Sequence, residues 1–298
     1  MTHYREGEVP GIDGTRIHYS VLTPDGPNEA DLVLCDGIGC DGFVWKYLTP
    51  SLAPRHRIVR WHYRGHGRSG TPLDLTRMGI EEIVGDLASV LVAAEIEKAV
   101  LIGHSVGVQV ILEAWRTLEE KIAGLIPVCG SYGRPLDTFH DTVHLKRAFP
   151  VVYRAMSGLP ELALRAWRVL LPSRAAWVIA LMAGEVNRSL IRIEDMQPYF
   201  DHLSRMDPKV FVSMLSKVSE HSARDLLPAI DVPTLVIAAE LDTFTPAWLS
   251  EEMADAIPDA ELLMVPKGSH VAPIEQPDLF ELRIEKFLRE KLGCYSGS

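Results

Sequence analysis

The stretch AVLIGHSVG, residues 99–107, decides the fold of this chain. Its apolar start predicts a buried strand over 99–102, and the spacing of the apolar residues that follow predicts a helix over 106–115. The turn between them, Gly103-His104-Ser105-Val106-Gly107, fits G-x-S-x-G, the pattern of a sharp strand-to-helix turn. Such a turn strains the serine backbone and leaves no room for a side chain at either glycine. We therefore expect the Ser105 hydroxyl to project from the carboxyl edge of a sheet; the alternative is a serine that only caps the helix.

The sequence around this stretch alternates short apolar strands with helix-period runs, which predicts the α/β class with a mostly parallel sheet covered by helices. An opening hairpin is expected at the turn Ile12-Asp13-Gly14. The expected strands are 8–11, 15–23, 32–35, 58–62, 99–102, 122–128, 234–239 and 261–265. The main expected helices outside the central part of the chain are 80–94, 106–115 and 277–292.

The strand signal disappears between residues 131 and 227, which predicts an all-helical insertion. Its net charge is +3, whereas the remainder of the chain carries −13, and this break in composition supports a separate layer. We therefore expect a core made of 1–130 and 228–298 and a helical cap at 131–227. Prolines are expected to separate the cap helices at Pro135, Pro150, Pro160, Pro172, Pro198 and Pro208.

Composition and charge exclude several classes of protein. A chain that is 47% hydrophobic and 23% charged is too apolar for intrinsic disorder, and a net charge of −10 disfavours binding to nucleic acid or anionic lipid. No apolar run is long enough to span a membrane. The four cysteines are too scattered for a disulfide scaffold or a metal knuckle, which favours reduced thiols and a cytoplasmic location.

A serine hydroxyl is a weak nucleophile at neutral pH, so Ser105 needs a base and an acid that orients the base. After a turn of this type the acid and then the histidine follow along the chain. Of the 11 histidines only His270 lies beyond the insertion, in a loop directly after the strand that ends at Val265. We therefore predict His270 as the base, the alternative being a histidine on a solvent-exposed loop.

The acid is expected in the loop after strand 234–239, where Glu240 and Asp242 compete. Asp242 is favoured because Thr245-Pro246 can open the next helix and because the shorter side chain is held more rigidly in a tight loop. Its role would be to accept the Nδ1 proton of His270, fix the tautomer and stabilise the imidazolium.

Acyl transfer also needs donors for the developing oxyanion. After such a turn these donors are the backbone N–H of the residue that follows the serine and one N–H in the loop after the third strand, here Val106 and Ile38. The loop DGIGCDG, residues 36–42, is rich in glycine, as a close backbone approach requires. A phosphate-binding loop is the alternative, but neither GK[ST] nor G-x-G-x-x-G is present.

Taken together, these motifs resemble the α/β-hydrolase fold, in particular the capped serine hydrolases. Besides the G-x-S-x-G turn, YRGHGRS at 63–69 is similar to the R-G-x-G-x-S turn after the fourth strand, LDTFTP at 241–246 to the acid loop and GSH at 268–270 to the histidine loop. The resemblance runs from the first hairpin to the last helix. It implies eight strands, a helical cap after the sixth, a substrate pocket between cap and sheet, and neither metal nor organic cofactor.

Two positions depart from the pattern of this family. Relatives usually carry His-Gly at the oxyanion loop and an Asp two residues before the arginine of R-G-x-G-x-S, whereas this chain has Asp36-Gly37 and His62. The two residue types are exchanged. We therefore hypothesise that Asp36 and His62 form a hydrogen-bonded pair that shapes the oxyanion loop; the alternative is two unrelated residues.

The residue at position 105 bears on the reaction. Epoxide hydrolases and haloalkane dehalogenases of similar fold use an Asp nucleophile, and serine implies acyl chemistry instead. We predict a carboxylesterase-like enzyme that cleaves small-molecule esters as a monomer or homodimer. A lactonase, a carbon–carbon bond hydrolase and a perhydrolase are alternatives on the same triad, and a ligand receptor is the non-enzymatic one. The cap aromatics and Met182 either line an acyl pocket or pack the cap: Phe139, Tyr153, Trp167, Trp177, Tyr199, Phe200 and Phe211.

Overall fold

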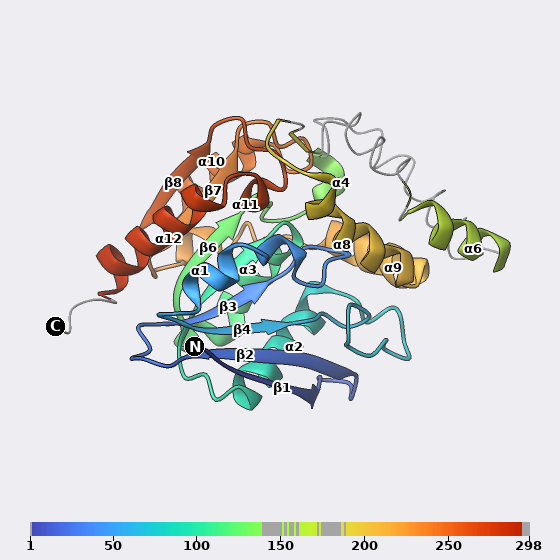
Figure 1. The fold of residues 1–298 in the computed structure, drawn as a ribbon, viewed down its shortest axis with the longest axis horizontal. Helices are drawn as coiled ribbons and strands as arrows, with labels where there is room; N and C mark the ends of the chain where they lie inside the picture. Colours follow the sequence, from blue (N-terminus) through green and yellow to red (C-terminus); the bar gives the residue numbers. More distant parts are fainter. Residues whose placement is uncertain are drawn as a thin grey trace.

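The frame of the molecule is an eight-stranded sheet in the order β1-β2-β4-β3-β5-β6-β7-β8 (Figure 1). The computed structural model describes residues 2–138 and 189–293, together with residues 151, 154, 158, 161–171, 173, 186 and 187 between them. Strand β2 runs antiparallel to both of its neighbours, and the other pairs are parallel. The mostly parallel sheet predicted from the sequence is confirmed.

The elements follow the predicted order. The strands are β1 (Thr2–Pro10), β2 (Arg16–Pro24), β3 (Asp31–Cys35), β4 (Arg57–Trp61), β5 (Ala99–His104), β6 (Ile122–Val128), β7 (Thr234–Ala239) and β8 (Ala260–Val265). The α-helices are α1 (Leu48–Leu52), α2 (Ile80–Ala93), α3 (Val106–Leu118), α4 (Pro135–Thr138), α6 (Glu161–Leu170), α8 (Ile193–Arg205), α9 (Pro208–Glu220), α10 (Ala247–Ala256), α11 (Ala272–Glu275) and α12 (Pro277–Leu292). Short 3-10 helices are η1 (Phe43–Trp45), η2 (Glu119–Lys121) and η4 (Leu227–Ala229).

The first strand is longer than its sequence predicted. The expected strand began at Glu8, whereas β1 pairs with β2 from Thr2 onward. Its early residues are mostly exposed and polar, so no apolar alternation marks them. Polar side chains are usual on an edge strand, because they discourage pairing with other molecules.

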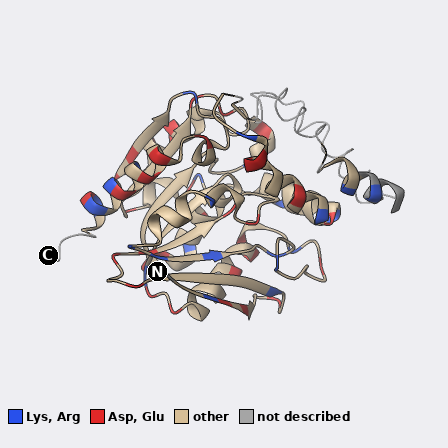
Figure 2. Cartoon of the chain, viewed as in Figure 1, with Lys and Arg blue, Asp and Glu red and all other residues tan. Residues whose placement is uncertain are grey.

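The central strands are buried on both faces. Every residue of β5 and of β7 is buried, which explains their continuous apolar sequences. One face of the sheet is covered by α2, α3 and α10 and the other by α1 and α12, each through its own apolar cluster. Charged residues gather on helices such as α12 and in loops, while these two central strands carry none (Figure 2).

Helix α2 shows how the sequence builds this cover. Ile80, Ile83, Leu87 and Leu91 recur at helical spacing and are fully buried against the sheet. Where the helix begins, the Glu82 carboxylate accepts a hydrogen bond from the backbone N–H of Gly79 at 3.2 Å. This contact satisfies a donor that the first turn leaves free.

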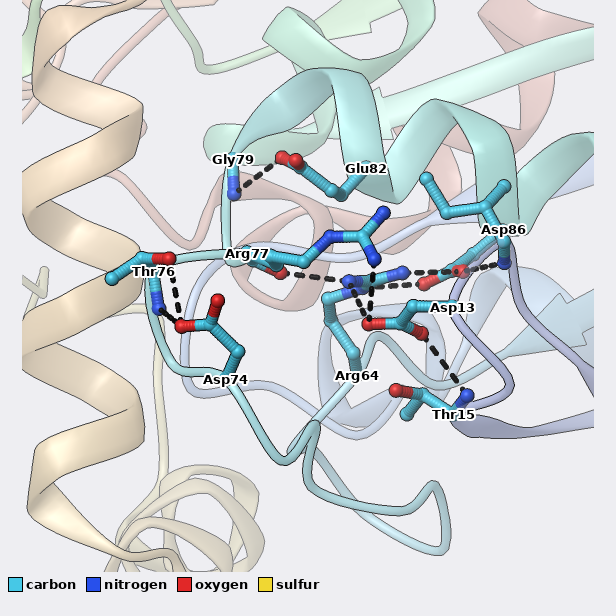
Figure 3. A network of polar contacts seen from close by, with 10 residues as sticks. Asp13, Thr15, Arg64, Asp74, Thr76, Arg77, Gly79, Glu82 and Asp86 are labelled. Carbon is cyan, nitrogen blue, oxygen red and sulfur yellow. Dashed lines mark hydrogen bonds and ion pairs between the residues drawn. The ribbon is translucent and has the colours of Figure 1, made fainter.

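A buried arginine joins the turn after β4 to α2 and to the β1–β2 hairpin (Figure 3). The Arg64 guanidinium donates to both carboxylate oxygens of Asp86 at 2.7 Å, and it also contacts Asp13 at 3.2 Å. It further donates to the carbonyl of Arg77 at 2.7 Å. Because the Arg64 side chain is fully buried, this paired geometry fixes the YRGHGRS turn firmly to the core.

A helical cap region follows β6, as the resemblance implied. Within the described residues its longest helices are α8 and α9, with 13 residues each. An isolated bridge between Gly133 and Ser222 joins the chain where it leaves the core to the chain where it returns. The domain boundaries at 130/131 and 227/228 stay predictions.

Two of the prolines expected to separate helices do so, since α4 begins at Pro135 and α9 at Pro208. Pro198 lies inside α8, so that prediction was wrong. A proline there costs one backbone hydrogen bond. Burial of α8 side chains such as Phe200 and Leu203 offsets that cost. Pro150, Pro160 and Pro172 lie outside the described residues. No helix in the described parts of the chain is long and apolar enough to cross a membrane.

Candidate active site

The candidate site lies where the parallel strands end. Ser105 follows β5, Asp242 follows β7 and His270 follows β8, while the loop 36–42 follows β3. Because these strands run parallel, their carboxyl ends share one edge of the sheet. Side chains that are far apart in the sequence therefore meet there.

Ser105 sits in the sharp turn that the G-x-S-x-G pattern predicts. Its φ of 56° and ψ of −118° lie in a strained region for a non-glycine residue. A Cβ on Gly103 would lie 2.3 Å from the carbonyl oxygen of Gly107, and one on Gly107 would lie 2.2 Å from that of Cys35. The two glycines are thus required sterically. The Ser105 hydroxyl makes no capping bond to α3, which contradicts the alternative of a mere helix cap.

Ser105, His270 and Asp242 form a continuous hydrogen-bonded chain. Ser105 Oγ lies 3.0 Å from His270 Nε2, and His270 Nδ1 lies 2.9 Å from Asp242 Oδ2. With the proton on Nδ1, the ring donates to the carboxylate and its Nε2 can accept the serine proton. The geometry therefore matches a serine activated by a histidine that an acid orients.

The Asp242 carboxylate is fully buried and well satisfied. It accepts from the backbone N–H groups of Phe244 and Thr245, both at 2.9 Å, and from the Thr245 hydroxyl at 2.9 Å. Glu240, the competing acid, instead accepts from the backbone N–H of Lys267 at 2.8 Å. Of these two carboxylates, the structure thus brings only Asp242 against His270.

His104 supports the loop that carries His270. Its Nε2 donates to the carbonyl of His270 at 2.8 Å, and burial lowers the pKa of His104 to about 3, so its ring is neutral at physiological pH. On the same loop, the Glu275 carboxylate accepts from both the backbone N–H and the hydroxyl of Ser269, at 2.7 and 2.6 Å. The Phe244 ring stacks on the His270 ring with centroids 4.8 Å apart. The imidazole is therefore held from several sides.

The predicted oxyanion loop crosses directly over the serine. A Cβ on Gly37 would lie 3.1 Å from the Cβ of Ser105, so the loop needs glycine there. Among the described residues, the backbone N–H groups of Ile38 and Val106 find no hydrogen-bond acceptor. Both remain available to an oxygen bound beside Ser105, which is the property that oxyanion donors require.

The predicted pair between Asp36 and His62 is wrong. Asp36 is buried, and its Oδ1 has no partner within the described chain, while His62 Nδ1 accepts from the backbone N–H of Arg68 at 2.9 Å. The pairing of β3 with β4 ends at Leu34, and the backbone carbonyl of Asp36 lies close to Gly107 of α3. The backbone N–H of His62 continues the pairing of β4 with β2 by donating to the His18 carbonyl at 3.0 Å. Apart from Arg60, the two side chains have different neighbours: Asp41 and Trp45 for Asp36, and His18, His66 and His202 for His62.

These two residues are electrostatically unusual. Burial raises the pKa of Asp36 to about 7, with Arg60 acting in the opposite direction. Burial lowers the pKa of His62 to about 3, and the neighbouring His18 lowers it further. Folding thus favours the neutral form of each group.

A cavity opens over Ser105 and His270. The polar side chains in its lining are Ser105, His270, His104, Tyr199 and Cys40, and the remainder is mostly apolar: Ile38, Phe43, Val186, Met196, Phe244 and Val271. No cluster of three or more His, Cys, Asp or Glu side chains in the described parts of the chain could hold a metal ion. The arrangement suits an apolar group placed next to an activated serine.

The cap aromatics divide between the two interpretations. Tyr199 lines the cavity, whereas Phe200 belongs to the buried core and Phe211 packs against Trp167 with ring centroids 6.5 Å apart. Phe139, Tyr153, Trp177 and Met182 lie outside the described residues. The sequence analysis missed Phe43, Met196 and Phe244 as lining residues, because no motif marks an apolar residue that faces a cavity.

Comparison with known proteins agrees with this architecture. The family model described as "Alpha/beta hydrolase family" matches residues 32–281 of this chain. Among curated proteins, "Putative carbamate hydrolase RutD" of Azorhizobium caulinodans is 31% identical over 266 residues, covering 87% of this chain and 91% of the relative. A protein of the same name from Klebsiella pneumoniae is 26% identical, covering 85% of this chain and 89% of that one.

Solved structures share the fold at lower sequence identity. A hydrolase from Pseudomonas aeruginosa PA01 superposes with a TM-score of 0.78 at 21% sequence identity; the match covers 95% of this chain and 98% of that hydrolase. The esterase RhEst1 from Rhodococcus sp. ECU1013 superposes with a TM-score of 0.76 at 24% sequence identity; the match covers 96% of this chain and 99% of the esterase. With its sheet order, its strand-end triad geometry and a family match over most of its length, this chain belongs to the alpha/beta hydrolase family.

Proposed function

We infer that this hydrolase cleaves carboxylic esters with small to medium acyl chains through an acyl-enzyme intermediate. The observation that carries the proposal is the hydrogen-bonded chain Ser105–His270–Asp242, which opens into a mostly apolar cavity. An activated serine supplies the nucleophile, and the apolar lining can hold an acyl chain.

The proposed reaction runs in two halves. Ser105 Oγ attacks the ester carbonyl carbon while His270 Nε2 takes its proton, and the backbone N–H groups of Ile38 and Val106 bind the oxyanion that forms. The C–O bond to the alcohol then breaks, and His270 returns the proton to the leaving oxygen. Water repeats the sequence on the acyl-enzyme, which releases the acid and restores the serine.

Asp242 contributes throughout by holding His270. As the ring becomes an imidazolium, the buried carboxylate stabilises its positive charge, and the bonds from Phe244 and Thr245 keep that carboxylate in place. No proton needs to reach Asp242 for either half of the reaction.

The apolar part of the cavity lining is the reason for proposing an ester rather than a carbamate. The RutD relatives carry carbamate hydrolase in their names. A carbamate presents an additional polar nitrogen, and burying a polar group against Phe43, Met196 or Val271 without a partner costs free energy. An ester acyl chain has no such requirement.

The test is a panel of p-nitrophenyl esters with acyl chains of increasing length, assayed in the parent and in Ser105→Ala. We expect a burst of p-nitrophenol followed by turnover, a rate that falls beyond a certain chain length, and a loss of at least about a thousandfold in kcat in the variant. Mass spectrometry of the intact protein after trapping identifies the intermediate, because an acyl group on Ser105 adds its own mass to that of the protein.

Lactone, vinylogous diketone, peroxide-dependent and carbamate substrates form the comparison arms. Higher kcat/KM on any of these than on the best ester would replace the ester assignment while keeping the serine mechanism. Saturable ester binding without turnover by the parent would point to a ligand receptor. Undiminished turnover in Ser105→Ala would overturn the mechanism itself.

A further inference from the structure

One residue of the oxyanion loop, Gly39, is held by two histidines whose rings stack with centroids 6.1 Å apart. The backbone N–H of Gly39 donates to His66 Nε2 at 3.0 Å, and His202 Nδ1 donates to the Gly39 carbonyl at 2.8 Å. His66 belongs to the YRGHGRS turn of the core, whereas His202 belongs to cap helix α8. The residue next to the proposed donor Ile38 is thus fixed by core and cap together.

The second nitrogen of each ring sets its tautomer. His66 Nδ1 donates to the Arg64 carbonyl at 2.9 Å, which leaves its Nε2 as an acceptor for Gly39. His202 Nε2 accepts from the backbone N–H of Gly67 at 2.8 Å, which leaves its Nδ1 as the donor. In both rings Nδ1 is therefore the donor and Nε2 the acceptor. Burial lowers the pKa of His66 to about 4, which keeps its acceptor nitrogen unprotonated at neutral pH.

The elements that carry the two histidines are themselves anchored. On the core side, the carbonyl that His66 binds belongs to Arg64, whose side chain is locked to Asp86 (Figure 3). On the cap side, the Asp195 carboxylate of α8 accepts from Lys46 at 2.6 Å and from the Tyr47 hydroxyl at 2.7 Å. Neither ring is free to follow a displaced loop.

Two glycines let cap and core approach this closely. Gly39 has a φ of +71°, and a Cβ on it would lie 3.1 Å from Leu203 of α8. Gly65 has a φ of +74°, and a Cβ on it would lie 2.4 Å from Val210 of α9. The left-handed backbone favours glycine at both sites, and the contact with Val210 leaves no room for a side chain at position 65. The cap helices therefore rest directly on the oxyanion loop and on the turn after β4.

We propose that His66 and His202 are positioning residues that hold the backbone N–H and carbonyl of Gly39 and thereby aim the Ile38 N–H at the reacting oxygen, so that the oxyanion site is complete only when α8 is seated. The proposal rests on the ester hydrolase function above. Neither histidine touches the reacting atoms; each acts through the backbone of the loop.

Conservative substitutions can distinguish the hydrogen bond made by Nδ1 from the hydrogen bond made by Nε2 in each ring. The amide nitrogen of an Asn side chain can take about the place of Nδ1, and the end of a Gln side chain can reach about the place of Nε2. At position 202 the Gly39 contact is made by Nδ1, so His202→Asn can retain it and His202→Gln loses it. At position 66 the contact is made by Nε2, so His66→Gln can retain it and His66→Asn loses it.

We therefore expect a crossed pattern in steady-state kinetics on the best ester. His202→Gln and His66→Asn lose about tenfold in kcat with little change in KM, because a misdirected oxyanion donor weakens the transition state more than the bound substrate. His202→Asn and His66→Gln recover most of the parental kcat. His221→Gln serves as the matched control, since His221 is also a buried histidine where the cap returns to the core, bonded to Gln109 and Glu113 instead.

The result that overturns the proposal is an uncrossed pattern: equal kcat losses in all four variants, or losses in melting temperature alone. Hydrogen exchange of the Gly39 amide gives a readout that needs no turnover. Exchange should quicken in His66→Asn and stay slow in His66→Gln. If the parent cleaves no ester, the ester assignment fails, and this exchange contrast still decides whether the two histidines hold the loop.

Discussion

Asp36 carries a carboxyl group into a buried position at the start of the oxyanion loop. Its pKa is raised to about 7 by burial, so the folded protein favours the neutral acid while the unfolded chain ionises near pH 4. The stability that this preference supplies is present below pH 4 and is lost as pH rises toward 7. We predict that Asp36→Asn, which removes the ionisation, stabilises the protein by roughly 2–4 kcal/mol at pH 8 and by much less at pH 5.

Urea unfolding at the two pH values measures this difference. Asp231→Asn, which changes an exposed carboxylate, is the matched control and should leave the free energy of unfolding unchanged at both. Equal stabilisation of Asp36→Asn at pH 5 and pH 8 would contradict the assignment of a raised pKa.

At this scale the sequence predicted some contacts and missed others. The approach of Ser105, Asp242 and His270 could be predicted because each follows a strand with a visible apolar pattern, and parallel strands end at one edge. The Asp36–His62 pair failed because the two side chains have different neighbours, and the sequence does not mark which neighbours a loop residue meets. His202 was missed as a partner of the loop because a lone histidine in a cap helix belongs to no motif.

Among the elements, the turn after β4 depends on one buried ion pair. Arg64 and Asp86 are both fully buried, and the pair joins this turn to α2. We predict that Asp86→Ala lowers the free energy of unfolding by about 3–5 kcal/mol, because it leaves the guanidinium buried with much weaker compensation. Chemical unfolding with a two-state fit provides the measurement.

The double variant Arg64→Met/Asp86→Leu tests the physical reason. Replacing both charges by apolar groups of similar volume removes the unpaired charge, so its loss should be clearly smaller than that of Asp86→Ala. A double variant less stable than the single one would show that shape and hydrogen bonding, rather than the uncompensated charge, dominate at this junction.

The order of elements could also be predicted, with errors that have physical causes. Strands that are buried on both faces can be predicted from continuous apolar runs, as for β5 and β7. The polar start of β1 carries no such signal, because its pairing with β2 uses the backbone. Pro198 was expected between helices, yet tertiary packing keeps it inside α8.

For the whole molecule, buried histidines set the response to acid. Burial lowers the pKa of His62, His66 and His104 to about 3, 4 and 3. The unfolded chain therefore takes up protons first as pH falls below 6.5, and each histidine costs about 2 kcal/mol of stability between pH 7 and pH 5. Asp36 acts in the opposite direction and offsets about one of them, so the free energy of unfolding should fall by roughly 4 kcal/mol.

Urea titrations at pH 7, 6 and 5 provide the measurement. His3→Gln, at an exposed position, should follow the parent, whereas His62→Gln should flatten the curve. A parental stability that stays constant over this range would contradict the lowered histidine pKa values.

The bridge between Gly133 and Ser222 means that the chain leaves the catalytic framework and rejoins it at neighbouring points. The segment between those points is therefore joined to the core at one place. A segment of different length could be inserted there with changes to the core at a single junction. Any replacement segment would have to supply again a side chain that bonds the Gly39 carbonyl, as His202 does.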